Sequence, residues 1–351
     1  MSRVPHFGFF CFRLRAIPRL PAPILAASIL IVLCVAVPPG ASQQVQDAPG
    51  EEIVANLAAG RVIIAVVKDA ILIATIENPI EPQTRVPTPV EINSRRAGII
   101  LGAVEWISPS SQLQFARLDR DLPHLRGRVA SQAPHLQQAQ VDTEAADIEA
   151  VGQGVAERLN QIAKNVHGKI NLAEDEPIAE LVLADYLEGY GPEVWQMTFS
   201  MQQAMQREDY FDTRVLMPRY SQIWPPEKGQ PRTLSEFHYP PEAKSLPLLD
   251  MLRDKDPAIE KICASDPKMR DVANRFLQGE STKNLAVDAT QFLRAALNVI
   301  APPQSRETMA TIGMESGFEW ILRPPAELQK PIEDKDRPAD APTLVHPHPS
   351  N

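Results

Sequence analysis

Two short apolar runs with a charged turn between them constrain the fold of this chain more than any other feature. Residues 62–67 and 71–76 are rich in β-branched side chains, which favour strands, and Lys68, Asp69 and Ala70 separate them. So short a connection predicts a tight hairpin. Because neither run alternates with polar residues, both strands are expected to be buried on two faces.

The rest of the chain is expected to form further strands and helices in alternating groups. Strands are predicted at 98–107, 194–201, 213–220, 233–239, 308–313 and 318–322. Helices are predicted from Asp142 to about 167, over 178–188, after the pairs Asp256-Pro257 and Asp266-Pro267, and over 282–300. The order of strands, helices, strands, helices and strands predicts an α+β layered sandwich.

Residues 1–42 are typical of a cleaved secretory signal peptide. They hold four arginines and no acidic residue, then an apolar run over 24–37, and then Gly40, Ala41 and Ser42, which suit a signal-peptidase site. The apolar run is short for a membrane span. We therefore expect export to a periplasmic or extracellular location, with a membrane anchor formed by residues 24–37 as the alternative.

Three further segments follow the signal peptide. Residues 43–59 are mostly polar and are predicted to be a linker. Residues 60–323 are predicted to form a single globular domain. Residues 324–351 contain seven prolines and almost no large apolar side chain, which predicts a disordered tail.

The composition after residue 42 limits the classes of function. It contains 31 basic and 44 acidic side chains, a net charge of −13, which repels nucleic acid and anionic lipid. Nucleic acid is therefore not expected as a partner, and a membrane is expected only if residues 24–37 stay uncleaved. Cys263 is the one cysteine left, so no internal disulfide can form. Its spacing from Ile259 and Ile262 predicts a buried thiol.

The common chemical motifs are absent from the sequence. It has no Gly-rich phosphate loop, no H-E-x-x-H, no G-x-S-x-G and no C-x-x-C. The histidines are scattered, and only His346 and His348 are close together, within the predicted tail. We therefore expect no cofactor and no metal site.

Two sets of side chains can be interpreted either as functional or as structural, and the structural interpretation is the one expected. Glu180, Asp185 and Glu188 fall on a predicted helix, where a solvated polar face is expected rather than an acid/base pair or a metal site. The four tryptophans, Trp106, Trp195, Trp224 and Trp320, lie in or beside predicted strands, and core packing is expected for them. Trp224, which precedes Pro225 and Pro226, is the candidate for an exposed aromatic residue.

Residues 61–75, RVIIAVVKDAILIAT, resemble the opening hairpin of the proteasome β-type N-terminal nucleophile (Ntn) hydrolases. A strand, a K-D-G turn and a second strand ending in A-A-D are typical of that family. The later order of elements agrees with the family pattern over about residues 60–323. The resemblance implies a four-layer αββα sandwich of two mainly antiparallel sheets, and self-association into a homo-oligomer, as is common in this fold class.

The resemblance does not extend to the catalytic residues. In the family, a Thr, Ser or Cys at the first residue of the first strand is the nucleophile, and its own α-amine serves as the base. That position is Gly60 here. The aspartate at the end of the second strand corresponds to Ile76, and the activating lysine is missing because none occurs between Lys68 and Lys164. We therefore assign no catalytic residue.

Three hypotheses about function follow from the sequence. The first is an exported, non-catalytic binding or structural protein on a proteasome-like scaffold, a pseudoenzyme with no ligand specified. The second is a secreted hydrolase whose nucleophile is exposed by processing, with Thr75, Thr84, Thr88 and Ser94 as the conceivable residues. The third is an envelope-anchored interaction module held by residues 24–37.

Overall fold

The computed structural model describes residues 54–78, 85–107, 116–127, 140–165, 177–206, 211–226, 233–240 and 246–324. All of them belong to one unit, Ala48–Asn351. The predicted signal peptide, most of the predicted linker and nearly all of the predicted tail lie outside these residues. No helix in the described ranges combines the length and the apolar character needed to cross a bilayer.

The larger sheet contains eight strands within the described residues. They are β1 (Val54–Ala58), β4 (Val90–Asn93), β5 (Arg96–Ile107), β6 (Ala116–Arg117), β7 (Pro177–Leu187), β8 (Gly191–Gln206), β9 (Phe211–Val215) and β10 (Arg219–Trp224). The main order is β1-β5-β7-β8-β10, with β4 and β6 paired to β5 and β9 paired to β8. Every one of these strand pairs is antiparallel.

The smaller sheet is built around the hairpin that the sequence predicts. Its strands are β2 (Gly60–Val66), β3 (Ala70–Glu77), β11 (Leu234–Tyr239), β12 (Glu307–Gly313) and β13 (Gly317–Leu322), in the antiparallel order β11-β2-β3-β12-β13. β2 and β3 are buried at every residue, as expected for strands covered on both faces. The predicted closing hairpin is confirmed as β12 and β13.

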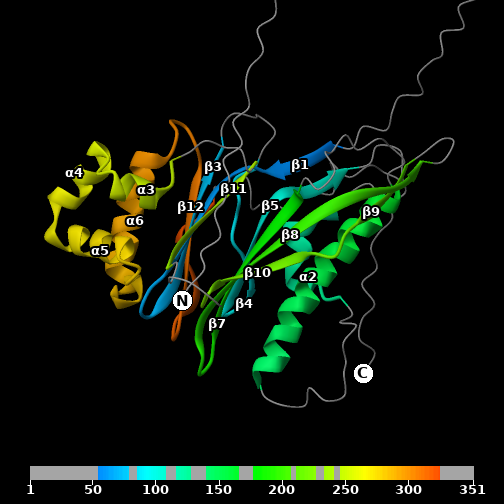
Figure 1. Ribbon diagram of the computed structural model, residues 1–351, viewed down its shortest axis with the longest axis horizontal. Helices are drawn as coiled ribbons and strands as arrows, with labels where there is room; N and C mark the ends of the chain where they lie inside the picture. Colours follow the sequence, from blue (N-terminus) through cyan, green and yellow to red (C-terminus); the bar gives the residue numbers. More distant parts are fainter. Residues whose placement is uncertain are drawn as a thin grey trace, which may run out of the picture. The chain divides into compact units, whose positions relative to one another are not determined.

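Helices cover the outer face of each sheet. The described helices are α1 (Leu118–Asp121), α2 (Gln140–Asn165), α3 (Leu248–Arg253), α4 (Pro257–Ser265), α5 (Pro267–Leu277) and α6 (Ala286–Ile300), with 3-10 turns at Leu122–His124 and Ser281–Lys283. One apolar cluster joins α2 to the larger sheet, a second joins the two sheets, and a third joins the smaller sheet to α3–α6. The chain is therefore α+β, with two antiparallel sheets stacked between helices (Figure 1).

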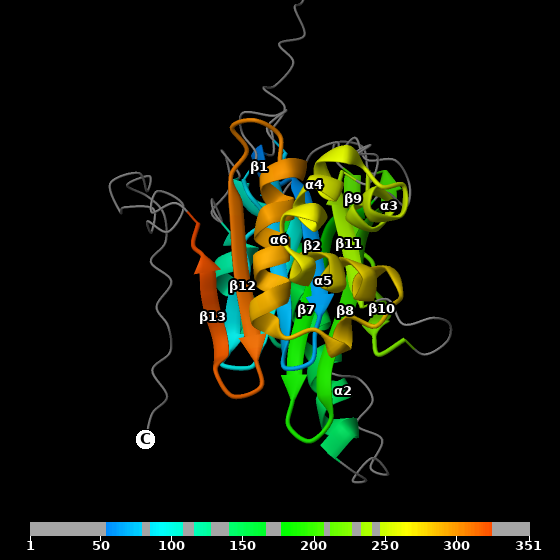
Figure 2. The same ribbon diagram turned by 90° about the vertical axis from the view of Figure 1, so that its left-hand side faces the viewer.

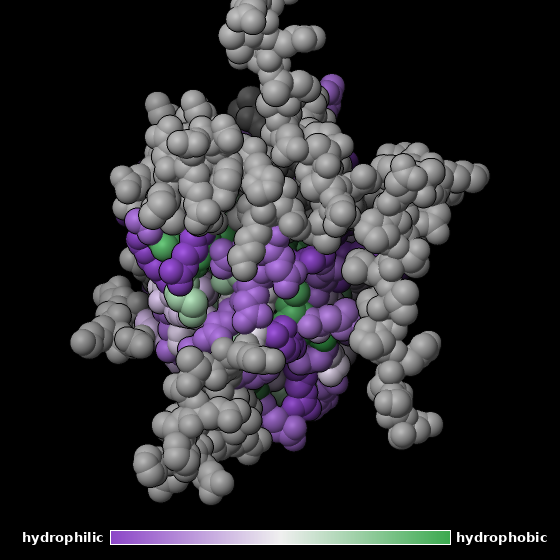
Figure 3. All heavy atoms as spheres, turned by 90° about the vertical axis from the view of Figure 1, so that its right-hand side faces the viewer, coloured by the Kyte–Doolittle hydropathy of each residue, from purple (hydrophilic) through white to green (hydrophobic). Residues whose placement is uncertain are grey.

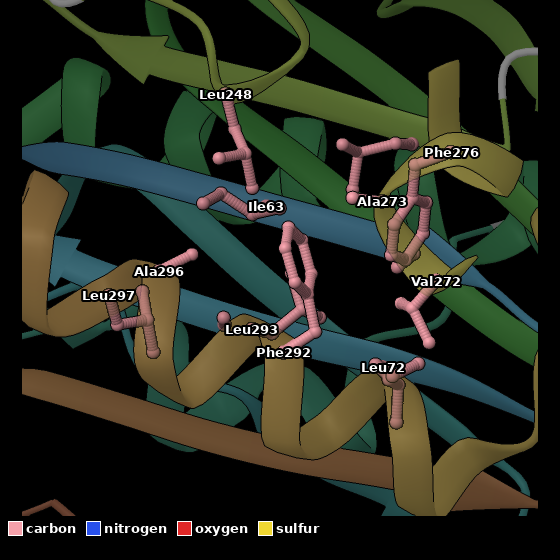
Figure 4. Close-up of a cluster of buried hydrophobic side chains, with 14 of the residues drawn as sticks. Ile63, Leu72, Leu248, Val272, Ala273, Phe276, Phe292, Leu293, Ala296 and Leu297 are labelled. Atoms are coloured by element: carbon pink, nitrogen blue, oxygen red, sulfur yellow. The ribbon is translucent and has the colours of Figure 1, made fainter. Parts of the chain in front are cut away.

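Two helices on the smaller sheet, α4 and α5, begin where local signals predict. Asp256 accepts hydrogen bonds from the backbone N–H of Ala258 and Ile259, and Asp266 accepts one from Lys268, each with a proline in the first turn. α6 lies along the smaller sheet in Figure 2, and its side chains Phe292, Leu293, Ala296 and Leu297 point into the core in Figure 4. The helix predicted over 282–300 is thus present as α6, although it begins at Ala286.

The prediction of a helix over 178–188 is wrong, because this segment is strand β7. β7 pairs with β5 on one side and β8 on the other. It is buried at nine consecutive residues, since α2 covers one face of the sheet and the smaller sheet covers the other. A strand covered on both faces loses the alternation that marks a strand, and its Ala, Glu and Leu residues are good helix formers.

Two other predicted boundaries are wrong. The predicted linker over 43–59 contains β1, which pairs with β5 from Val54 to Ala58, so ordered structure begins before Gly60. The predicted strand over 213–220 is two strands, β9 and β10, which both pair with β8. The partner of β1 is distant in sequence, and local composition gives no signal of that pairing.

Helices form one outer side of the structure, and a mainly hydrophilic surface is seen on the opposite side. α3–α6 lie over the smaller sheet in Figure 2. On the opposite side, in Figure 3, the described surface is mainly hydrophilic with small, separate hydrophobic areas. Isolated apolar side chains on a surface are ordinary and do not by themselves mark an interface.

Candidate functional site

The first residue of β2 is the position at which the family resemblance expects a nucleophile. Gly60 has φ +150, and a Cβ added to it would lie 2.0 Å from the backbone oxygen of Ile76. No side chain fits there unless β3 moves. The chain before Gly60 is also built into the fold, because Ala59 donates a backbone hydrogen bond to Arg85 and accepts one from Asn78.

The end of β3, where the family carries an aspartate, is apolar in this chain. Ile76 is 3% exposed and belongs to the core between the smaller sheet and its helices. Its neighbour Glu77 is a buried carboxylate, but Arg306 donates to it from both Nε and Nη2. This ion pair connects the end of β3 to the residue that precedes β12. Glu77 therefore has a structural role, since its charge is balanced by Arg306.

The hydroxyl groups proposed as alternative nucleophiles are separated in the structure. Thr75 is fully buried and hydrogen-bonded to the hydroxyl of Thr308 at 2.7 Å. Ser94 is exposed in the turn between β4 and β5. Thr88 donates to the backbone oxygen of Val86 at 2.9 Å. Thr84 lies outside the described residues. The structure does not bring the three described hydroxyl groups together with a base.

The three carboxylates expected on one solvated helix face lie on and beside strand β7, so that expectation is wrong. Glu180 and Asp185 are buried, and Glu188 is exposed in the turn after the strand, where Arg95 binds it at 2.9 Å. Asp185 accepts a hydrogen bond from Arg96 Nε at 2.6 Å. The three do not converge, so they form neither an acid/base pair nor a ligand set.

Glu180 has an unusual environment for a carboxylate. Its side chain accepts one hydrogen bond from Gln196 at 3.1 Å, and burial raises its pKa because the charged form loses water. The Glu180 carboxyl group therefore loses its proton at a lower pH in the unfolded chain than in the folded chain. The contribution of Glu180 to the free energy of unfolding is therefore fully present below the ordinary carboxyl pKa. It is lost as the pH rises through the raised pKa of the folded chain.

Glu180→Gln is accordingly expected to stabilise the protein at pH 7 by up to ~1 kcal/mol, because the amide keeps the contact with Gln196 without a buried charge. Urea unfolding of both proteins at pH 7 and at pH 3 checks this. The two free energies of unfolding are expected to converge at the lower pH. A variant that is less stable at pH 7 would contradict the assignment of a costly buried charge.

The histidines and the cysteine that the structure describes do not form a metal site. His238 lies 3.7 Å from Glu236, which also binds Arg61 and accepts a hydrogen bond from the first residue of α3. Cys263 is buried on α4, as predicted, and burial raises the pKa of its thiol. Within the described ranges, no group of three or more His, Cys, Asp or Glu side chains could hold an ion.

A cavity of about 230 Å³ lies beside the end of β1, and we call it the edge pocket. Its apolar lining comes from β1, the segment before β4, β4 itself and β5, namely Ala58, Val86, Val90, Ile100 and Val104. Trp320 and Pro324, on and just after β13, also line it. The edge pocket is thus formed by residues of both sheets.

Four charged side chains also line the edge pocket, and two of them form a pair. Arg117 donates to Asp119 from Nε at 3.1 Å and from Nη2 at 2.5 Å, so this pair is bidentate. Arg85 forms an ion pair with Glu105, a residue on β5 that is 2% exposed. Arg323 is exposed, and no carboxylate of the described residues pairs with it. Among the described residues, Arg323 is therefore the cation of this pocket that no carboxylate neutralises.

A comparison of the sequence with protein-family models finds no match, and a comparison with curated proteins finds none either. The proteasome-type resemblance therefore rests on the pattern of residues 61–75 and on the order of the elements.

Sequence reasoning did not find the edge pocket. Trp320 was assigned to core packing, and Arg85, Arg117 and Arg323 were not singled out. These residues come from separate segments and share no spacing motif, so a local pattern could not have identified them. The expected exposed aromatic residue, Trp224, is half-buried against the cluster between the sheets.

Proposed function

We propose that this chain is an exported, non-catalytic binding protein on a scaffold like that of the proteasome β-type Ntn hydrolases. The observation that carries the proposal is the closed environment of Gly60. In an N-terminal nucleophile hydrolase this position supplies both the attacking side chain and a free amine. Here the side chain is absent, and the backbone of β3 occupies the space that a side chain would need. Strand β1 precedes Gly60 and pairs with β5, so the amine of Gly60 is part of a continuous backbone.

The arrangement of layers supports the scaffold part of the proposal. Two antiparallel sheets stack between helices, and the predicted first hairpin lies at the centre of one sheet. A fold by itself does not define a function, so the argument against catalysis depends on the site and not on the scaffold. The edge pocket supplies a concave surface, lined by apolar side chains and a few polar groups, as is usual for small-ligand sites.

The hydrolase alternative has one observation in its favour, which is that Thr88 lines the edge pocket. Its hydroxyl donates to a backbone oxygen, whereas an activated nucleophile needs a base as its hydrogen-bond acceptor. The alternative of an envelope-anchored module depends on residues 24–37, and fractionation into soluble and membrane proteins separates it from the exported form.

Labelling with an electrophile tests the proposal directly. The exported protein carrying Cys263→Ala is incubated with an epoxyketone and, separately, with a β-lactone, which acylate or alkylate activated Thr and Ser residues. The intact mass is expected to stay unchanged. A stoichiometric adduct on a Thr or Ser would overturn the non-catalytic assignment and support the hydrolase. A proteasome β subunit treated in parallel serves as the positive control for the reagents.

A further inference from the structure

We propose that the edge pocket binds a small monocarboxylate that has a compact apolar or aromatic body. The proposal rests on the proposed function, since it specifies the ligand class for a binding protein without catalysis. It is argued from the lining, the charges and the size of the pocket.

The apolar part of the pocket favours a hydrocarbon body in the ligand. Val86, Ile100 and Val104 are at most 3% exposed and line one part of the cavity. Trp320 lines it from the other sheet, and its ring is held in an edge-to-face contact with Phe318, with centroids 5.4 Å apart at 86°. A fixed indole beside aliphatic side chains favours a flat or branched apolar group.

The charges of the pocket favour an anion. Three arginines and one carboxylate line it, in a chain whose formal net charge is −9. A guanidinium group presents five N–H donors, so Arg85 and Arg117 keep donors that are not used by Glu105 and Asp119. A locally basic pocket on an acidic protein attracts anions to this position.

The number of unneutralised charges favours a monoanion over a dianion. Glu105 neutralises Arg85, and Asp119 neutralises Arg117. Of the charged side chains that the structure describes in the pocket, Arg323 is left as the cation for the ligand. A carboxylate matches one guanidinium through two parallel hydrogen bonds. A phosphate dianion would bring a second charge without a cation to balance it.

The size of the cavity limits the body of the ligand. Pockets for drug-sized molecules occupy roughly 300–1,000 Å³. The edge pocket, at about 230 Å³, is smaller. It suits a carboxylate attached to a single ring or a short branched chain, and not a long acyl chain or a nucleotide.

Titration calorimetry with four probes tests the ligand class. The full exported chain is titrated with phenylacetate, with phenylacetamide as the neutral isostere, with acetate as the anion without a body, and with inorganic phosphate. Phenylacetate is expected to bind saturably. Phenylacetamide lacks the charge and acetate lacks the apolar body, so each is expected to bind at least about tenfold more weakly. Equal binding of phenylacetate and its amide, tighter binding of phosphate, or no saturable binding at millimolar phenylacetate would each overturn the proposal.

Arg323→Gln tests the role of the unpaired cation. Because this side chain is exposed, the variant is expected to fold normally and to bind phenylacetate about tenfold more weakly, while its weak affinity for phenylacetamide stays unchanged. Arg120→Gln is the matched control, since Arg120 is an exposed arginine on α1 that does not line the pocket. The control variant is expected to keep the wild-type affinity, and equal losses in both variants would contradict a specific contact.

Recovery of the probe distinguishes this proposal from the proposed function. Phenylacetate is expected to be recovered unchanged by chromatography after long incubation. If it does not bind and the electrophiles leave no adduct, the ligand class is wrong and the non-catalytic assignment stands. If an electrophile forms an adduct within the edge pocket, the proposed function is wrong whatever the pocket binds.

Discussion

Phe292→Ala is expected to lower the free energy of unfolding by about 3–5 kcal/mol. Phe292 is fully buried on α6, and its ring points toward Ile63 on β2 in Figure 4. Its ring centroid lies 5.7 Å from that of Phe276 on α5. Truncation removes these contacts and leaves a cavity between the smaller sheet and its helices. The sheet cannot collapse into this cavity because its other face is packed on the larger sheet.

Urea unfolding followed by circular dichroism measures this effect. Val287→Ala is the control on the same helix, since Val287 is 60% exposed and its truncation is expected to change the free energy by no more than about 0.5 kcal/mol. Similar losses in both variants would contradict the placement of α6 on the smaller sheet.

Arg96→Met is expected to cost about 3–5 kcal/mol, because it leaves a buried carboxylate without its cation. Arg96 and Asp185 are 5% and 3% exposed and form an ion pair between β5 and β7. Arg96 also binds Asp147 on α2, which Arg126 contacts at 3.3 Å. This network connects the larger sheet to its covering helix at a point where the sequence predicted only solvent-exposed carboxylates.

The double variant Arg96→Met with Asp185→Leu separates the cost of an unpaired charge from the loss of packing. Replacing both partners with apolar side chains is expected to recover most of the stability lost in the single variant. Asp147 is less buried and stays solvated. If the double variant is less stable than Arg96→Met alone, the pair itself contributes net stability, and the burial argument is wrong.

The elements that could be predicted from the sequence have strong local signals. The β2–β3 hairpin has two β-branched runs around a three-residue turn, and α4 and α5 each begin at an aspartate followed by proline. α6 shows apolar residues at helical spacing. In each of these cases the residues that determine the structure belong to one continuous segment, so no distant partner needs to be known.

The elements that could not be predicted depend on at least one partner strand that is distant in sequence. β7 is a strand because β5 and β8 provide its hydrogen bonds and because both faces of the sheet are covered. Its sequence, PIAELVLADYL, suits a helix equally well when it is considered alone. β1 has a short, mixed sequence and is a strand because β5 extends far enough to pair with it.

One part of the candidate site could also be predicted from the sequence, and another part could not. The resemblance to the Ntn-hydrolase hairpin predicts that the nucleophile position falls on Gly60, and the structure shows that a side chain does not fit there unless β3 moves. The edge pocket could not be predicted, because Arg85, Arg117 and Arg323 become neighbours only when both sheets are in place. A charged cluster of this kind has no signature in local spacing.

The N-terminal sequence and intact mass of the mature protein test the central claim most directly. The non-catalytic account predicts a mature chain that begins before β1, near Ser42 or Gln43, so that Gly60 stays within a continuous backbone. A mature chain whose first residue is a Thr, Ser or Cys next to a strand would contradict the account, because its free amine and side chain would together form an N-terminal nucleophile.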